Sequence, residues 1–483
     1  MGLTSAWTAH WRARPDATVL VDAADGVRLD GAAMLRETAA AAARLHAAGV
    51  RPGDRVLLSC SPGASTVLAY VAVLRLGAVV VPANTAYTRP ELEHVVGDAR
   101  PVLAVVDDPA RVPLPPERVL TADRLAGVPD AGGTDAPGLD RAGDDALAMI
   151  GYTSGTTGRP KGAMLDHGNL RAGAEALVSA WGWTPSDRLV HALPMFHMHG
   201  LGAGVNGTLT AGASMVVLPR FEPAAVLDAV RDHAATMFFG VPTMYARLRD
   251  ADTLPGLAGL RLLVSGSAPL DPVLFHDVAR LAGQPPVERY GMTETVMLTS
   301  NPLYGERRAG WVGHPLPGVA LRLDDDGAVL VRGPSVFRGY WERPEATAAA
   351  FTDDGWFRTG DVGELSDDGC LRLVGRASDL IITGGYNVYP REVEDAVREH
   401  PGVVDVAVVG VPDPTWGERV VAFVVLGDAL ADGMGADVAR VLDEHAAGRL
   451  AAYKRPRAWT VVPDLPRNPM GKVVRSELRA APG

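Results

Sequence analysis

Short apolar segments alternate with longer stretches of helical character over much of the chain, and this alternation limits the possible folds more than any other feature. Residues 30–49 have the Ala-rich spacing of a helix and end at Gly49, a residue type that commonly terminates helices. Helices placed between short apolar strands are typical of α/β folds. The candidate strands are 55–58, 78–81, 102–106, 147–150, 216–218 and 260–264. We therefore expect an α/β fold up to about residue 320.

The residue composition and the expected secondary structure change at two places along the chain. Residues 108–145 are rich in Pro, Gly and Asp, which predicts a surface connection. After Gly318, short β-like segments appear at 320–323 and 329–331 with turn residues between them. Residues 375–379 (Gly-Arg-Ala-Ser-Asp) then have the character of a domain boundary.

A compact α+β pattern follows this boundary. Pro390 opens a helix in which Val393 and Val397 share one face. The expected elements are helices at 391–399 and near 436–449, and strands at 403–409 and 419–426. We expect a large domain over 1–376 and a small domain over 377–483, which is long enough to fold around its own core.

Composition excludes several classes of function. The net charge is −11, which argues against non-specific binding to nucleic acid or to an anionic membrane. The two cysteines, Cys60 and Cys370, lie far apart and form neither a metal motif nor a disulfide framework. The N-terminus lacks the apolar region of a secretory signal, and no run approaches the roughly 20 apolar residues of a membrane span. We expect a cytoplasmic protein.

A loop rich in hydroxyls, glycines and cations follows the apolar segment 147–150. Residues 152–162 read YTSGTTGRPKG. Small residues let backbone N–H groups approach an anion, and hydroxyls with Arg159 and Lys161 complete a phosphate cradle. The spacing is not that of the Walker loop, because Gly158 is not followed directly by Lys. A Gly/Thr-rich linker is the alternative, but a linker has no need of these cations.

Each of three further motifs is weak evidence when taken alone, since each also fits an ordinary turn or a solvated tail. Residues 290–294 (Tyr-Gly-Met-Thr-Glu) combine an aromatic ring that can stack on a base with a carboxylate that can hold Mg²⁺. Residues 358–361 (Arg-Thr-Gly-Asp) are followed by Gly375-Arg376, and such an Asp and Arg can hold a ribose. Residues 468–472 (Asn-Pro-Met-Gly-Lys) place a lysine near the C-terminus.

With these motifs in this order, nearly the whole chain resembles the adenylate-forming superfamily, which includes acyl-CoA synthetases, nonribosomal adenylation domains and firefly-type luciferases. The resemblance implies a large domain of stacked α/β sheets with a small distorted β-barrel, followed by a smaller mobile α+β domain. It implies an enzyme that uses ATP and Mg²⁺ to join a carboxylic acid to AMP and then transfers the acyl group to coenzyme A. The small domain would rotate between the two half-reactions.

The resemblance also assigns nucleotide-binding residues. The phosphate loop would comprise Thr153, Ser154, Gly155, Thr156, Thr157, Gly158 and Lys161. Tyr290 would stack on adenine, with the remaining nucleotide contacts at Gly266, Ser267, Ala268, Gly291, Met292 and Thr293. Asp361 and Arg376 would hold the ribose, and Thr156 and Glu294 would serve the Mg²⁺ site.

The resemblance makes Lys472 the catalytic lysine, between the substrate carboxylate and the α-phosphate. A desolvated ammonium there would stabilise the charge that develops during the displacement. Gly384, Gly385 and Tyr386 would line the tunnel for the thiol. The hinge position holds Ser378, where the family usually has an acidic residue or Lys, so Asp379 is the alternative hinge.

Three segments look most like malonyl-CoA synthetases: 194–200 (PMFHMHG), 241–247 (VPTMYAR) and 288–291 (ERYG). This resemblance implies that Arg289 and Arg247 face the distal carboxylate, while His197 gates the acyl site. Arg suits a second carboxylate because its planar fork binds in a bidentate manner. Pairing of Arg289 with Glu288 is the alternative. The acyl-site residues are thus His197, Met198, Arg247, Arg289, Met292 and Trp311.

Two departures from that subfamily bear on the acid. Leu298 stands where its members usually have Asn, and Trp311 stands where they tend to have a small residue. Trp311 could reshape the pocket for another acid. The alternatives are an adenylating ligase for an aryl or fatty acid that delivers the acyl group to a carrier protein or an amine, and a non-catalytic nucleotide-binding relative.

Overall fold

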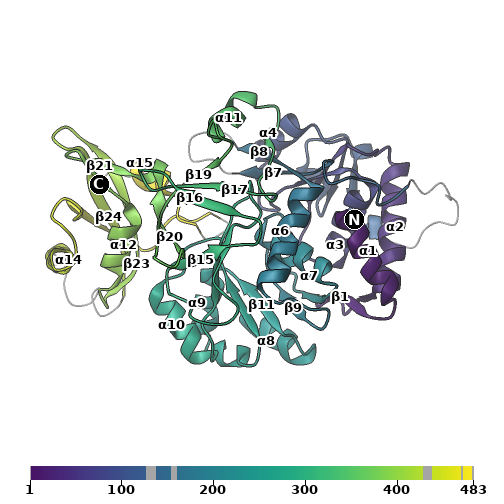
Figure 1. The fold of residues 1–483 in the computed structure, drawn as a ribbon, viewed down its shortest axis with the longest axis horizontal. Helices are drawn as coiled ribbons and strands as arrows, with labels where there is room; N and C mark the ends of the chain where they lie inside the picture. The colour runs from purple at the N-terminus through teal and green to yellow at the C-terminus, as the bar shows by residue number, and fades with distance from the viewer. Residues whose placement is uncertain (1, 127–137, 154–159, 428–437, 469–471, 481–483) are drawn as a thin grey trace. The chain divides into compact units, whose positions relative to one another are not determined.

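The computed structural model describes residues 2–126, 138–153, 160–427, 438–468 and 472–480. They fall into two compact units, drawn as ribbons in Figure 1. The first unit contains Met1–Leu321, Val331–Phe357 and Gly369–Leu371, and the second contains Arg322–Leu330, Arg358–Asp368 and Arg372–Gly483. Two β segments that precede residue 376 thus belong to the second unit. The functional domain boundary at 376 stays a prediction.

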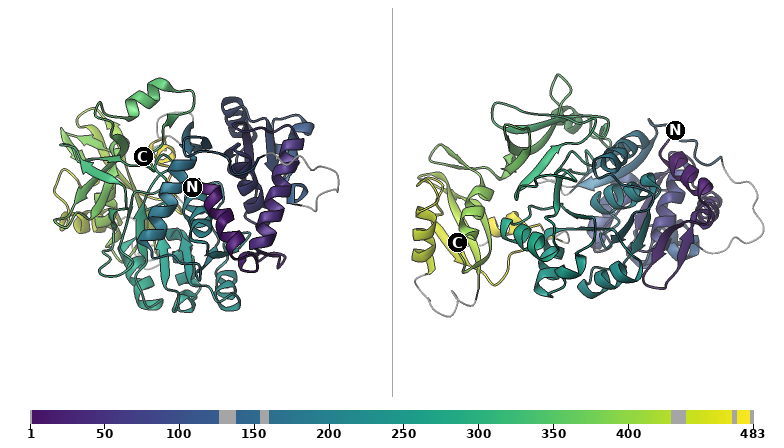
Figure 2. Two further views of the ribbon diagram at one scale, coloured as in Figure 1. Left: turned by 45° about the vertical axis from the view of Figure 1, so that its right-hand side comes forward. Right: turned by 60° about the horizontal axis from the view of Figure 1, so that its bottom comes forward.

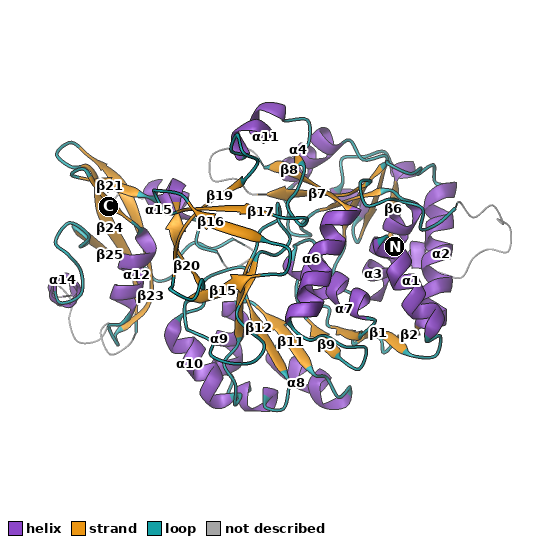
Figure 3. Ribbon diagram, viewed as in Figure 1, coloured by secondary structure: helices purple, strands orange, loops and turns teal. Residues whose placement is uncertain are grey.

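The first unit holds most of the helices and strands (Figure 3). Its helices are α1 (Leu3–Ala13), α2 (Gly31–Ala47), α3 (Ala64–Leu76), α4 (Arg89–Ala99), α5 (Ala122–Ala126), α6 (His167–Ala180), α7 (Asn206–Ala211), α8 (Pro223–Asp232), α9 (Pro242–Asp250), α10 (Pro272–Leu281) and α11 (Pro344–Ala350). Its strands are β1 (Thr18–Asp22), β2 (Arg28–Asp30), β3 (Arg55–Ser59), β4 (Val79–Pro82), β5 (Leu103–Val106), β6 (Val119–Thr121), β7 (Leu147–Thr153), β8 (Lys161–Asp166), β9 (Arg188–His191), β10 (Ser214–Val217), β11 (Met237–Gly240), β12 (Leu262–Ser265), β13 (Val287–Tyr290), β14 (Thr299–Ser300), β15 (Trp311–Pro315) and β18 (Gly339–Tyr340).

These strands form two sheets. One has the order β18-β8-β7-β4-β3-β5-β6, and the other contains the run β15-β14-β13-β12-β11-β9-β10-β1-β2. Helix α3 contacts β4 of the first sheet and β1 of the second, so it lies between them. Nearly every residue of α3 is buried, as expected for a helix that is apolar on all sides. The expected stack of α/β sheets is confirmed.

Four parallel strands bring the expected acyl and adenine loops to one sheet edge. Strands β9, β11, β12 and β13 are neighbours and run in parallel. Loops 194–200, 266–270 and 291–294 follow β9, β12 and β13 respectively. Because ligands of open α/β sheets bind beyond the carboxyl ends of the strands, we expect the site at this edge.

Part of the Pro-rich segment 108–145 forms regular secondary structure. Strand β6 pairs in parallel with β5, and α5 follows it. The expected surface connection therefore contains one short, half-buried strand at the edge of the sheet. The two 3₁₀ turns before it, Pro109–Arg111 and Pro116–Arg118, begin at prolines.

The second unit is mostly β structure around its own apolar core (Figure 2). Strands β16 (Ala320–Leu323), β17 (Ala328–Arg332), β19 (Phe357–Leu365) and β20 (Leu371–Arg376) form an open run, and the described residues contain no closed barrel. The other elements are β21 (Ile381–Thr383), β22 (Tyr386–Val388), α12 (Pro390–Arg398), β23 (Val403–Asp413), β24 (Gly417–Leu426), α14 (Val438–Ala447), β25 (Ala458–Val461) and α15 (Arg475–Ala480). The expected α+β elements are therefore present. Among the described helices of either unit, none has the length and apolar character needed to cross a bilayer.

Candidate active site

The phosphate loop connects two antiparallel strands. Thr153 at the end of β7 pairs with Lys161 at the start of β8, and residues 154–159 lie outside the described part of the chain. Ser154, Gly155, Thr156, Thr157 and Gly158 therefore keep their predicted roles without structural description. The strand pairing shows that the chain leaves and re-enters the sheet at adjacent positions, as a cradle around a small anion requires.

Tyr340 links the end of this loop to Glu294. The Tyr340 hydroxyl donates to Glu294 Oε1 at 3.0 Å, and Lys161 Nζ lies 5.3 Å from the centroid of the Tyr340 ring. Burial, and secondarily the charge of Glu294, raise the pKa of Tyr340, so the hydroxyl stays protonated and donates. The Lys161 ammonium thus lies over the ring of Tyr340, and the buried Glu294 carboxylate accepts from its hydroxyl.

Glu294 fits the way proteins hold magnesium beside nucleotides. Its side chain is buried, and no group of three His, Cys, Asp or Glu residues that could hold a metal ion occurs in the described part of the chain. Mg²⁺ is commonly bound through one or two carboxylates together with substrate phosphates and water. A single carboxylate beside a phosphate loop agrees with that mode.

The segment 290–294 packs against the strand that leads into the loop. A Cβ on Gly151 of β7 would lie 2.5 Å from Thr293 Cγ2, so only glycine allows this approach. Tyr290 is buried at the end of β13, and Met292 N donates to Thr295 Oγ1 at 3.3 Å. The structure therefore brings the predicted adenine and metal segment next to the loop.

Arg289 is a buried cation with unused hydrogen-bonding capacity. Its side chain is 5% exposed, and neither Nε nor Nη2 has a hydrogen-bond partner among the described residues. Glu288 does not pair with it: Glu288 Oε1 accepts from Gly310 N at 2.9 Å, and successive residues of a strand point to opposite faces. Burial lowers the pKa of Arg289 to about 9, so the guanidinium is still charged at neutral pH.

The loop after β12 lies against this guanidinium. A Cβ on Gly266 would lie 2.5 Å from Arg289 Cζ, so a side chain there would displace the guanidinium. The next residue, Ser267, has a φ of +73°, a backbone strain of the kind that clusters at functional sites. Its hydroxyl lies 3.2 Å from His199 Nδ1.

His199 is the neutral partner of this cluster. Burial first, and then the nearby charge of Arg289, lower the pKa of His199 well below its usual value. Its Nε2 has no partner in the described residues, and the ring stacks on Phe239 with centroids 6.4 Å apart. When Ser267 donates to His199 Nδ1, the His199 proton is on Nε2, so Arg289 and His199 each have an N–H without a partner among the described residues.

Other predicted acyl residues have different surroundings. Met198 is buried near Gly202, while His197 is half-buried and its Nδ1 accepts from His199 N at 3.5 Å. The Arg247 side chain is 55% exposed, pairs with Glu222 at 3.5 Å and stacks on Phe221. Trp311 is half-buried on β15. The substrate roles of all four stay predictions, and Arg289 has the surroundings best suited to an anion.

The predicted ribose pair forms within the second unit. Arg376 Nε lies 3.0 Å from Asp361 Oδ1, and the Asp361 carboxylate is nearly buried. Such an ion pair can offer both a hydrogen-bond acceptor and a donor to the two hydroxyls of a ribose. Asp379 pairs with Arg475 and Arg479, each at 3.6 Å, and Ser378 lies beside it in the 3₁₀ turn Ala377–Asp379.

Lys472 is exposed and hydrogen-bonds through its backbone to Asn468, while residues 469–471 lie outside the described part of the chain. Its N donates to Asn468 Oδ1 at 3.0 Å, and Asn468 N donates to Lys472 O at 2.9 Å. Gly384 and Gly385 both have positive φ in the turn between β21 and β22, and Tyr386 is exposed and stacked on Tyr453. These are features of the second unit alone.

Sequence reasoning missed His199 and Tyr340. His199 lies in the quoted segment 194–200, but nothing local distinguishes it from His197. Tyr340 lies 46 residues after Glu294 and has no sequence motif that links the two.

Comparison with known proteins gives the family. Residues 7–341 match the AMP-binding enzyme family, and residues 392–472 match the AMP-binding enzyme C-terminal domain. The chain belongs to the AMP-binding enzyme family. The match covers both predicted parts of the chain.

Several members of the family are similar over most of their length. Malonate–CoA ligase ACSF3, mitochondrial, of Bos taurus is 39% identical over 485 residues, which cover 88% of this chain and 81% of that protein. The crystal structure of ATP-bound MatB from Rhodopseudomonas palustris has a TM-score of 0.89 at 39% identity, covering 99% of this chain and 98% of that one. Feruloyl-CoA synthase from Amycolatopsis sp is 38% identical over 478 residues, 94% of each chain.

Proposed function

We propose that the protein is an ATP-dependent, AMP-forming acyl-CoA synthetase whose acid is malonate or a 2-substituted malonate. The observation that carries the choice of acid is the buried Arg289 guanidinium, whose Nε and Nη2 have no partner among the described residues. A buried unpaired charge is costly, and a substrate carboxylate would remove that cost. Similarity to proteins named malonate–CoA ligase supports the same acid.

The proposed reaction has two displacements. A malonate carboxylate oxygen attacks the α-phosphorus of ATP, the bond to the bridging oxygen breaks, and pyrophosphate leaves. The sulfur of CoA then attacks the acyl carbon, and AMP leaves with the oxygen that joined it to the acyl group. In this scheme Arg289 binds the distal carboxylate, which does not react, and the buried Nε2 of His199 is a further group available to it.

The remaining residues act on the nucleotide. Tyr290 stacks on adenine, Asp361 and Arg376 hold the ribose, and Lys472 stabilises the charge at the α-phosphate. Glu294, with Thr156 of the loop, would hold Mg²⁺, which when bound neutralises phosphate charge and orients the leaving pyrophosphate. His197 gates the acyl site, and the small domain of residues 377–483 rotates between half-reactions about Ser378 or Asp379, which opens the thiol tunnel along Gly384, Gly385 and Tyr386.

The acceptor can be tested directly. With malonate, ATP and Mg²⁺, we expect malonyl-CoA, AMP and pyrophosphate in equal amounts when CoA is added, measured by mass spectrometry and phosphate assay. A phosphopantetheinyl carrier protein and a simple amine are the comparison acceptors. Malonyl transfer to either of these, with no malonyl-CoA formed, would contradict CoA ligation.

We place the enzyme in the cytoplasm, although its ACSF3 relatives are named as mitochondrial.

A further inference from the structure

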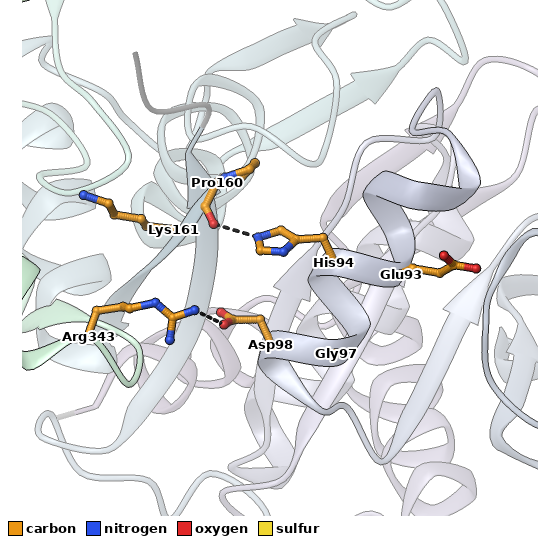
Figure 4. A pocket seen from close by; sticks show the side chains of 7 residues that line it. All are labelled: Glu93, His94, Gly97, Asp98, Pro160, Lys161 and Arg343. Atoms are coloured by element: carbon orange, nitrogen blue, oxygen red, sulfur yellow. Dashed lines mark hydrogen bonds and ion pairs between the residues drawn. The ribbon is translucent and has the colours of Figure 1, made fainter. Parts of the chain in front are cut away.

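Helix α4 contacts the residues on both sides of the phosphate loop. His94 Nε2 lies 2.9 Å from the carbonyl oxygen of Pro160, just after the loop (Figure 4). Asp98 Oδ2 accepts from the Tyr152 hydroxyl at 2.8 Å, just before the loop. Because residues four apart share one helix face, a single turn of α4 contacts both flanks.

The two contacts belong to a larger set of interactions. The edge of the His94 ring meets the Tyr152 ring, with centroids 6.2 Å apart at 82°. Arg343 Nη2 lies 2.5 Å from Asp98 Oδ1, and Trp341 Nε1 donates to Asp98 O at 3.3 Å. His94, Asp98 and Arg343 border a hollow of about 530 Å³ that Lys161 also lines.

Helix α4 is itself firmly placed. Its N-terminus has a capping box formed by Thr88 and Glu91, and Leu92, Val95 and Ala99 are buried in the core of the seven-stranded sheet. A side chain fixed on such an element positions its partner more precisely than one on a loop. The helix can therefore serve as a fixed reference for both loop ends.

We propose that His94 and Asp98 are positioning residues for nucleotide binding, which set where the chain enters and leaves the phosphate loop. This inference rests on the proposed role of the loop in holding the β- and γ-phosphates. Neither side chain need touch ATP. Their effect is to fix the carbonyl of Pro160 and the ring of Tyr152, the residues that border the loop on its two sides, so that these borders need no further ordering when ATP binds.

The hydrogen bond dictates which replacements preserve the contact. A carbonyl oxygen only accepts, so His94 must carry a proton on Nε2. His94→Gln retains a donor of similar reach, whereas His94→Phe retains the ring against Tyr152 and removes the donor. Tyr152→Phe removes the hydroxyl that Asp98 accepts from and retains its ring. Glu93→Gln is a matched control, since Glu93 is exposed on α4 and pairs with Arg89.

The test compares the affinity for Mg·ATP with the affinity for AMP, measured by calorimetry in the absence of acid. We expect His94→Phe and Tyr152→Phe each to weaken ATP binding about three- to tenfold, as the loss of one hydrogen bond does, and to change AMP binding less than about twofold. His94→Gln should restore most of the ATP affinity, and Glu93→Gln should match the wild type.

Two results would overturn the proposal. Equal losses of ATP and AMP affinity would show a general structural role, and unchanged ATP affinity in both variants would show no positioning role. Because no acid is present, failure of malonate as a substrate would refute the proposed function and leave this comparison intact.

Discussion

Lys472→Gln is expected to slow malonate-dependent pyrophosphate release about 10²–10³-fold, the usual loss when one preorganised charge partner is removed. The proposed mechanism uses this ammonium only while the α-phosphate is displaced. Thioester formation from supplied malonyl-AMP and CoA should therefore change less than about threefold. The contacts between Lys472 and Asn468 involve the Lys472 backbone, so the substitution preserves them.

The control for this substitution is Arg440→Gln. Arg440 is exposed on α14 of the same unit and pairs with Glu444, so its loss removes a similar charge outside the proposed site. Both half-reactions should match the wild type in this variant. If Lys472→Gln slowed both half-reactions equally, or left pyrophosphate release within threefold of wild type, the proposed role of Lys472 would be wrong.

Arg289→Ala is expected to lower kcat/KM for malonate about 10²–10⁴-fold. Hydrogen bonds to charged groups contribute roughly 1.5–3 kcal/mol each, and two nitrogens of this guanidinium are unused among the described residues. Each 1.4 kcal/mol corresponds to about a factor of ten. Affinity for ATP should stay within about threefold, because the distal carboxylate of the acid is its proposed partner.

The ratio of malonate to acetate activity distinguishes a loss of substrate recognition from a general structural defect. Arg289→Ala should lower this ratio, since acetate has no second carboxylate to lose a partner. Arg289→Lys should recover part of the malonate activity, and less than half of it, because Lys has no bidentate fork. Arg249→Ala is the matched control, since Arg249 is partly exposed and pairs with Asp250. Equal losses of malonate, acetate and ATP would mean that Arg289 is structural.

Local sequence was sufficient to predict several buried strands. The apolar runs at 55–58, 78–81 and 102–106 correspond to β3, β4 and β5, with shifts of about one residue at their ends. Strands buried on both faces read as continuous apolar runs, so their detection needs no long-range information. The strands β9, β11 and β13, which lead to the site, were not predicted, and neither was β6, which is short and lies at the edge of its sheet.

Contacts between distant segments could not be predicted in the same way. The strand period shows that Glu288 and Arg289 point to opposite faces, but it does not show which face lacks a partner. The answer depends on segments distant in sequence: Gly310 N donates to Glu288, whereas Gly266 lies against Arg289. His94 and Asp98 lie more than 50 residues before the loop that they contact, and no motif links them to it.

The most direct test of the proposed activity is acid-dependent pyrophosphate release by the wild-type protein. The panel is malonate, methylmalonate, acetate, octanoate and ferulate at matched concentrations. Ferulate is included because a feruloyl-CoA synthase is 38% identical to this chain. Because the buried Arg289 guanidinium is proposed to bind a second carboxylate, malonate and methylmalonate should lead acetate, octanoate and ferulate by at least about tenfold in kcat/KM. Octanoate or ferulate ahead of malonate would contradict the account.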